Sequence, residues 1–337
     1  MNAYKPLLAI TMGDPAGAGP EIVVKALNSA AVAAICRALI IGDAGVMRAA
    51  ADIVGMPMHI HAVSTPGEMS EKEGVINVLD LKNVDLSRLV RGQVSAAAGK
   101  AAYEAIERAT LLTLERATDA IVTSALNKDA LNQAGYHFPG HTQILAHLCG
   151  VHDAVMMLAA DNLRIVHVST HVSLRQACDL VTKERILHVL QLGVEAAKSM
   201  GVPQPRVVIP GLNPHSGEGG LFGMEEEEHI IPAIEEAGSL GFNVRGPLPP
   251  DTAFLRAYRG EFDLVVAMYH DQGHIPIKMV GFEKGVNVTL GLPIIRTSVD
   301  HGTVFGKAGK GTADPTSMIE AIKLAATMCR VTRESAQ

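Results

Sequence analysis

Residues 263–273 read Asp-Leu-Val-Val-Ala-Met-Tyr-His-Asp-Gln-Gly, and this stretch decides the fold class. The run Asp263–Met268 is almost continuously apolar, which is typical of a strand covered on both faces of its sheet. A half-exposed strand would instead alternate apolar and polar residues. The run ends at Tyr269, so His270 follows directly on a strand that we expect to be buried.

Two other segments repeat this arrangement. Leu163–Val168 is followed by Ser169-Thr170-His171, and Arg206–Ile209 is followed by Asn213-Pro214-His215. Ligand sites of open α/β sheets lie at the carboxyl ends of the strands, so we expect His171, His215 and His270 to converge there. Three neutral imidazoles leave coordination positions open, as in a catalytic metal site. The residues do not choose among zinc, cobalt, nickel and manganese, and an ordinary hydrogen-bonded histidine is the alternative for each one taken alone.

Strand-like and helix-like patterns alternate along the whole chain, which indicates an α/β protein. The length suits two lobes, which we expect to be residues 1–130 plus 303–337 and residues 131–302, with the active-site cleft between the lobes. The expected strands are 7–12, 38–42, 75–80, 120–124, 155–159, 163–169, 206–210, 263–268 and 286–290. The expected helices are 20–28, 45–54, 93–116, 142–148, 183–200, 225–240, 252–258 and 315–329.

The composition excludes several classes of protein. Of the 337 residues, 48% are hydrophobic and 19% are charged, with a net charge of −6. A nucleic-acid-binding face would need a basic excess, so no nucleic-acid partner is expected. No apolar run reaches the roughly 18 residues of a membrane span. The four cysteines form no Cys-x-x-Cys pair, which favours a reducing compartment, and a cytoplasmic protein is expected.

A second group of residues suits an anionic ligand. His141 and Thr142 open a predicted helix whose free N–H groups can bind an anion, although Thr142 could simply cap that helix. Lys278, Asn287 and Arg296 each stand inside an apolar stretch. A buried cation is costly unless it meets a negative charge, so these residues suit a phosphate or carboxylate. Ordinary salt bridges are the alternative.

Two glycine-rich stretches remain, Gly13–Glu21 and Gly306–Gly311. The first follows a strand and opens a helix but lacks the third glycine of the dinucleotide fingerprint, and neither carries the Gly-Lys-Ser/Thr of a phosphate loop. A turn or close backbone packing is the simplest interpretation of both. The residues that would bind a nucleotide cofactor are therefore unknown from the sequence.

Taken together, these motifs resemble the 4-hydroxythreonine-4-phosphate dehydrogenase family over essentially the whole chain. The resemblance is carried by Met12-Gly13-Asp14-Pro15-Ala16-Gly17, Pro139-Gly140-His141-Thr142, Asn213-Pro214-His215, Tyr269-His270-Asp271-Gln272-Gly273, Gly285-Val286-Asn287, Gly291-Leu292-Pro293, Arg296-Thr297-Ser298 and Asp300-His301-Gly302-Thr303.

The resemblance implies a two-lobed, three-layer α/β/α fold like that of the isocitrate and isopropylmalate dehydrogenases rather than a standard Rossmann domain. It implies NAD-dependent oxidation of the 3-hydroxyl of a phosphorylated hydroxy acid, then decarboxylation to dihydroxyacetone phosphate or a similar product. The implied cofactors are NAD, with NADP also open, and a divalent ion of zinc, cobalt, manganese or magnesium. The implied metal ligands are His171, His215 and His270, and the implied substrate contacts are His141, Thr142, Lys278, Asn287 and Arg296.

Within the family, Gly273-His274-Ile275-Pro276-Ile277-Lys278 and Pro249-Pro250-Asp251-Thr252 resemble a catabolic branch that oxidises 4-phospho-D-threonate and 4-phospho-D-erythronate. The alternative substrate is the 4-hydroxy-L-threonine phosphate of pyridoxal phosphate synthesis. Two departures leave the substrate and the cofactor preference open: Gln143 stands where many members have glutamate, and Gly306 stands where an acidic residue is common.

The family also implies a homodimer with the site shared between subunits. His171 and His215 would come from one subunit, and His270 with Lys278 from the other. Lys278, Asp251 and water are the candidate proton acceptors. Two further functions stay open: a metal-dependent hydrolase or aldolase, and a phosphometabolite-binding protein without turnover.

Overall fold

The computed structural model describes residues 4–56 and 58–335, and the chain forms two compact units. Unit 1 comprises residues 1–154 and 292–337, and unit 2 comprises residues 155–291. The expected boundaries were 130/131 and 302/303. They differ because α5 (Lys128–Gln133) and α6 (His141–Cys149) pack on α4 (Ala96–Leu114), while β12 (Ile295–Val299) pairs with β5 (Ala120–Thr123).

Unit 1 contains six parallel strands in the order β3-β4-β2-β1-β5-β12. Their remaining bounds are β1 Leu7–Thr11, β2 Arg37–Gly42, β3 His59–Val63 and β4 Val75–Asp80. The central strand β1 pairs with β2 on one side and β5 on the other, so the direction of winding changes between β1 and β5. Loops after these two strands therefore lie at the point where open α/β sheets place ligands.

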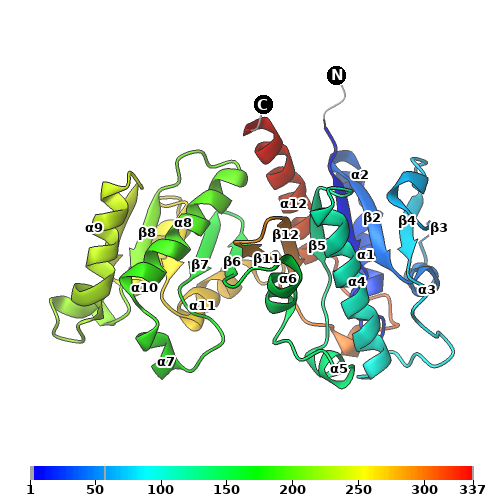
Figure 1. The fold of residues 1–337 in the computed structure, drawn as a ribbon, viewed down its shortest axis with the longest axis horizontal. Coiled ribbons are helices and arrows are strands. Elements are labelled where there is room, and N and C mark those ends of the chain that lie inside the picture. Colours follow the sequence, from blue (N-terminus) through cyan, green and yellow to red (C-terminus); the bar gives the residue numbers. More distant parts are fainter. Residues whose placement is uncertain (1–3, 57, 336–337) are drawn as a thin grey trace. The chain divides into compact units, whose positions relative to one another are not determined.

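Helices cover both faces of the unit 1 sheet, as Figure 1 shows. The alanine-rich α4 packs on β1, β2 and β5, and its small side chains allow α5 to approach closely. The other face is covered by α1 (Gly19–Leu27), α3 (Ala44–Val54) and α12 (Thr316–Ser335), with α2 (Ala30–Ile35) beside α12. The predicted α/β/α layering is thus confirmed in this unit.

Unit 2 has a mixed sheet in the order β11-β6-β7-β10-β8-β9. Its strands are β6 Val155–Ala160, β7 Leu163–His167, β8 Val207–Pro210, β9 Val244–Leu248, β10 Leu264–Ala267 and β11 Val286–Leu290. The strands β7, β10, β8 and β9 run parallel, whereas β6 is antiparallel to both β7 and β11.

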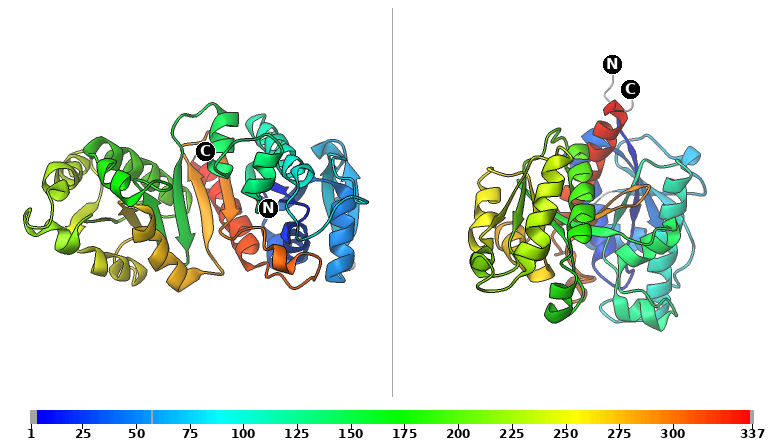
Figure 2. Two further views of the ribbon diagram at one scale, coloured as in Figure 1. Left: turned by 90° about the horizontal axis from the view of Figure 1, so that it is seen from below. Right: turned by 60° about the vertical axis from the view of Figure 1, so that its left-hand side comes forward.

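Helices also cover both faces of the unit 2 sheet (Figure 2). On one face α8 (Lys183–Ser199) packs on β7 and β10, and α9 (Ile231–Ser239) packs on β9. On the other face α10 (Pro250–Tyr258) packs on β8, and α11 (His270–Gly281) packs on β6 and β7. The short helix α7 (Leu174–Asp179) follows β7.

The helix α11 was missed from the sequence because it contains Gly273, Pro276 and Gly281. Each of these residues is unfavourable in an ordinary helix interior. Gly273 has a packing reason, since a Cβ atom there would lie 2.4 Å from Nε2 of His167. The backbone of α11 therefore approaches β7 more closely than any side chain would allow. Three strands, β3, β9 and β12, were also not expected.

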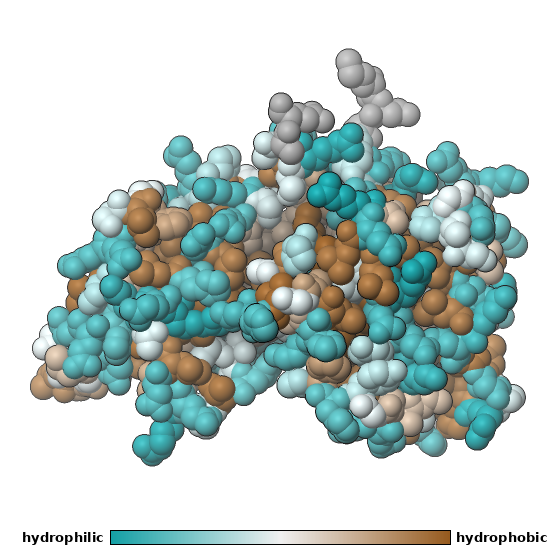
Figure 3. Space-filling model, viewed as in Figure 1, coloured by the Kyte–Doolittle hydropathy of each residue, from teal (hydrophilic) through white to brown (hydrophobic). Residues whose placement is uncertain are grey.

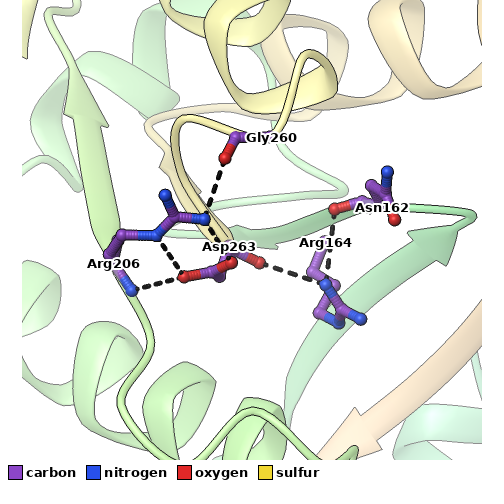
Figure 4. A network of polar contacts seen from close by, with 5 residues as sticks. All are labelled: Asn162, Arg164, Arg206, Gly260 and Asp263. Carbon is purple, nitrogen blue, oxygen red and sulfur yellow. Dashed lines mark hydrogen bonds and ion pairs between the residues drawn. The ribbon is translucent and has the colours of Figure 1, made fainter.

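An exposed polar network ties the amino ends of β8 and β10 together (Figure 4). Nε and one terminal nitrogen of Arg206 donate to the two carboxylate oxygens of Asp263, both at 2.9 Å. The same guanidinium donates to the Gly260 carbonyl at 2.8 Å. These hydrogen bonds hold the pKa of the Asp263 carboxyl below its usual value.

Hydrophobic side chains reach the surface among hydrophilic ones on the face drawn in Figure 3. In unit 2, the most exposed large apolar side chains are Met279 at 81%, Phe282 at 73% and Leu221 at 71%. Within the described part of the chain, no helix is both long and apolar enough to span a membrane.

Candidate functional site

The three strands that precede the predicted ligands are neighbours. β10 lies between β7 and β8 and runs parallel to both, so the three carboxyl ends share one edge of the unit 2 sheet. The edge is tightened by Ser169, whose hydroxyl donates to the Met268 carbonyl at 3.1 Å. His171 follows β7 and His270 opens α11 after β10, and their ring centroids are 5.8 Å apart. Two of the three predicted imidazoles therefore lie close together, as the positions of their strands predict.

The ring of His270 is oriented by its neighbours. Its Nδ1 lies 2.6 Å from a carboxylate oxygen of Asp271. Because a carboxylate only accepts hydrogen bonds, Nδ1 carries the proton and Nε2 keeps its lone pair. His274 stacks on His270 with centroids 3.6 Å apart and donates from Nδ1 to the His270 carbonyl at 2.9 Å. In the neutral ring, this arrangement leaves the lone pair of Nε2 available, as a metal ligand requires.

Behind this stack lies a fully buried histidine, His167, at 4.8 Å between ring centroids from His274. Burial and the neighbouring imidazoles lower the pKa of His167 to about 3 and that of His274 to about 4. Both rings are therefore neutral at physiological pH, so stacking them costs no charge repulsion. Neither residue was predicted as part of the site, although the four-residue spacing of His270 and His274 would place them on one helix face.

The third predicted ligand, His215, follows β8 in the turn Pro214–Glu218. Its ring lies 6.2 Å from that of Phe222, measured between centroids, and His215 itself adopts a left-handed backbone with φ of 53°. Among residues 4–56 and 58–335, no three His, Cys, Asp or Glu side chains form a group that could hold a metal ion. A single chain therefore brings His171 and His270 together but not His215.

In unit 1, a buried cation affects the pKa of a half-buried histidine. Arg296, on β12, is 2% exposed and donates from Nε and a terminal nitrogen to the Thr123 hydroxyl at 3.2 and 2.7 Å. Burial lowers the pKa of Arg296 to about 9. Burial, and next the charge of Arg296, hold the pKa of His141 well below its usual value. Nε2 of His141 is buried without a hydrogen-bond partner. A buried guanidinium is costly unless it meets a negative charge, so Arg296 suits an anionic ligand.

The remaining predicted residues are distributed as follows. The N-cap of α6 is Gly140, and Thr142 is the second residue inside the helix. No side chain caps this helix, so the prediction that Thr142 caps it is wrong. Lys278 is exposed on α11, two helical turns from His270, with Nζ 5.8 Å from the centre of the Phe282 ring. Asn287 lies half-buried on β11, and Asp251 is exposed in the first turn of α10.

The two glycine-rich stretches meet within unit 1. The buried carboxylate of Glu21 accepts the backbone N–H groups of Gly309 and Gly311 at 2.6 and 2.7 Å. A Cβ atom at Gly19 would lie 2.8 Å from the Ser124 hydroxyl, which explains the glycine there. Close backbone packing, the expected interpretation, accounts for both stretches, and we assign no cofactor contact to them.

The α/β fold, the paired imidazoles at a sheet edge of unit 2 and the buried arginine of unit 1 are the features that an α/β enzyme acting on an anionic small molecule would need. The chain belongs to the family of pyridoxal phosphate biosynthetic protein PdxA, whose model matches residues 34–325. The predicted family and the oxidoreductase class are thereby confirmed.

Relatives of stated activity cover nearly the whole chain. A D-threonate 4-phosphate dehydrogenase from Cupriavidus necator is 48% identical over 329 residues, which are 97% of this chain and 98% of the relative. Among solved structures, a 4-hydroxythreonine-4-phosphate dehydrogenase from Burkholderia phymatum is 49% identical with a TM-score of 0.85, covering 97% and 99% of the two chains. A terephthalate 1,2-cis-dihydrodiol dehydrogenase from Burkholderia xenovorans LB400 is 31% identical with a TM-score of 0.69, covering 96% and 98%.

Proposed function

We propose that this chain oxidises the 3-hydroxyl of 4-phospho-D-threonate or 4-phospho-D-erythronate with NAD and then decarboxylates the product. The observation that carries the proposal is the buried guanidinium of Arg296, whose charge also lowers the pKa of His141, since a phosphate needs such a cation with its directed hydrogen-bond donors. The similarity to the Cupriavidus necator enzyme supports the same substrate class. Thr142, Lys278 and Asn287 are proposed as further substrate contacts.

The reaction balances as follows. When bound, NAD would accept the C3 hydrogen as a hydride with its bonding electron pair, so that C3 is oxidised and the cofactor is reduced. The hydroxyl proton passes to a base, and a 3-keto acid results. The bond from C2 to the carboxylate then breaks, carbon dioxide leaves, and the electron pair remains as an enolate that takes up a proton. Both phosphorylated acids yield dihydroxyacetone phosphate in this way.

Lys278 is our choice as the proton-transferring residue at its Nζ atom. It lies four residues after His274 and eight after His270 on α11, so the three side chains line one face of that helix. Its charge also contributes to lowering the pKa of His274. Asp251 lies on a different helix, α10, and is exposed.

His171, His215 and His270 are proposed to hold the divalent metal. The donor set fits, because Nε2 of His270 is free for coordination and His171 stands beside it at a ring separation of 5.8 Å. When bound, the metal would lower the pKa of the substrate hydroxyl and stabilise negative charge on oxygen. The chain's own contribution is to orient the imidazoles, as Asp271 and His274 do for His270.

We propose that a second copy of the chain completes this site. Exposed apolar side chains flank both halves of it: Met279 and Phe282 lie on or beside α11, and Leu221 follows the His215 turn. Exposed apolar groups of this size mark association surfaces when they are contiguous. The contact between His171 and His270 favours one copy supplying these two and the other copy supplying His215. This differs from the split expected from the sequence, which separated His171 from His270.

Subunit exchange tests that assignment. Mixing His215→Ala with His270→Ala should restore activity, because one site of each heterodimer carries no lesion. Mixing His171→Ala with His270→Ala should restore none. Recovery in the second mixture would place these two ligands on different subunits. Failure of every mixture, with exchange verified by differently tagged chains, would place all three ligands in one chain.

The substrate assignment is tested by turnover. The purified enzyme should form reduced cofactor from 4-phospho-D-threonate and 4-phospho-D-erythronate, and faster than from 4-hydroxy-L-threonine phosphate, with NAD preferred over NADP. Product without any change in cofactor absorbance would favour a hydrolase or aldolase. Ligand-induced thermal stabilisation without product would favour a binding protein.

A further inference from the structure

A completely buried carboxylate, Glu226, lies behind the His215 turn. It is 0% exposed and begins a π-helical turn, Glu226–Ile230, before α9. A buried carboxylate is costly unless hydrogen bonds satisfy its oxygens. Both oxygens are satisfied by one residue of the turn: Oε1 accepts the backbone N–H of Asn213, and Oε2 accepts its side-chain Nδ2, each at 2.8 Å.

The turn is wrapped closely around this carboxylate. A Cβ atom at Gly211 would lie 2.9 Å from Oε1 of Glu226, and one at Gly217 would lie 2.7 Å from Oε2. Only glycine permits such an approach at either position. The carboxylate is therefore enclosed by residues before and after His215, and it determines the width of the turn.

Between these contacts the backbone adopts a conformation that L-residues disfavour. His215, Ser216 and Glu218 have φ values of 53°, 57° and 49°, and Gly217 has a φ of 79°. Consecutive left-handed residues persist only where surrounding contacts enforce them, and such segments gather at functional sites. The two hydrogen bonds from Asn213 to Glu226 fix the backbone two residues before His215 and so help to enforce this conformation.

We infer that Glu226 is a positioning residue that holds the His215 turn in the conformation needed for metal binding. This inference rests on the proposed function, because it takes His215 to be a metal ligand. Glu226 does not touch the metal or the substrate in this account. It acts because its carboxylate only accepts hydrogen bonds, so it can satisfy both the backbone N–H and the side-chain NH2 group of Asn213.

Glu226→Gln tests that polarity. Whichever way the new amide turns, its NH2 group faces a donor of Asn213. We expect zinc affinity, measured by competition with a chromophoric chelator, to fall on the order of 10- to 100-fold, as for other residues that orient metal ligands. In the metal-free enzyme, amide hydrogen exchange across residues 211–220 should accelerate. Glu227→Gln is the matched control, since Glu227 is exposed one residue away, and it should change neither reading.

A reversal of polarity provides the rescue. Glu225 also accepts from Asn213 Nδ2, at 2.7 Å, so the rescue variant is Asn213→Asp with Glu225→Gln and Glu226→Gln. Here both glutamines donate to the new carboxylate, and zinc affinity should return to within a few-fold of wild type.

Three results would overturn the inference. They are unchanged zinc affinity and exchange in Glu226→Gln, an equal loss in Glu227→Gln, or a folded rescue variant that stays as weak as Glu226→Gln. The proposed metal site fails separately if His215→Ala binds zinc as tightly as wild type. In that case the exchange measurement alone still decides whether Glu226 holds the turn.

Discussion

Replacing Arg296 with lysine keeps a positive charge on β12 but removes the planar fork of donors. The guanidinium uses two nitrogens on the Thr123 hydroxyl, at 3.2 and 2.7 Å, and is 2% exposed. A lysine at this position can make fewer directed hydrogen bonds, and its ammonium loses more hydration when buried. The variant should therefore bind the phosphorylated substrate more weakly while the chain remains folded.

The size of the effect follows from one lost bond. A hydrogen bond to a charged group contributes about 1.5–3 kcal/mol, which corresponds to roughly 10- to 150-fold in affinity. We expect an increase of this order in the KM for 4-phospho-D-threonate, measured from initial rates of reduced cofactor formation at saturating NAD. Activity with unphosphorylated D-threonate, which already lacks the phosphate contact, should change little.

Arg206→Lys is the matched control for this variant. Arg206 also makes a two-nitrogen contact, with Asp263 at 2.9 Å, but it lies at the amino ends of β8 and β10 and is not a proposed substrate contact (Figure 4). The Arg206→Lys variant should therefore leave the KM for 4-phospho-D-threonate unaltered. If Arg296→Lys weakens both substrates equally, or if Arg206→Lys weakens binding as much, Arg296 is not a phosphate ligand.

Three further predictions concern the metal and the fold. His215→Ala should lose bound metal by elemental analysis while keeping the melting temperature of the metal-free wild type, and full metal occupancy would remove His215 from the ligand set. Gly273→Ala should lower the free energy of unfolding by about 1–3 kcal/mol, because its Cβ would lie 2.4 Å from His167 Nε2. Gly238→Ala in α9, where a Cβ meets open space, should be neutral or stabilising by up to about 1 kcal/mol, and equal effects would contradict the packing argument. Asp263 has a native pKa below its usual 3.8, so its contribution to stability is present above that value and is lost as the pH falls through the lower native pKa. Asp263→Asn should therefore flatten the fall of melting temperature in that acid range, and an unchanged slope would show that the pair does not matter.

Local patterns were enough to predict the strands that precede His171, His215 and His270. Buried strands such as β7, β8 and β10 are short continuous apolar runs, so their positions and the histidines after them follow from sequence alone. The strand β12 was missed because Arg296 interrupts its apolar pattern, although that residue was itself singled out. The helix α11 was missed because it contains a glycine, Gly273, that is required by close packing against His167 on β7, more than a hundred residues earlier in the chain.

Side-chain positions within the site depend on contacts that no local pattern encodes. In the sequence, Glu226 is one of four consecutive glutamates at positions 225–228, yet it is buried against the His215 turn. The left-handed backbone of His215 is equally invisible in the sequence.

The proposed oxidative decarboxylation is tested most directly by measuring both products from one reaction. The enzyme, loaded with zinc, is given 4-phospho-D-threonate labelled in its carboxylate carbon, with NAD in excess. We expect labelled carbon dioxide and reduced cofactor to appear in equimolar amounts. Reduced cofactor without labelled carbon dioxide would contradict decarboxylation, and labelled carbon dioxide or other product without reduced cofactor would contradict the dehydrogenase assignment itself.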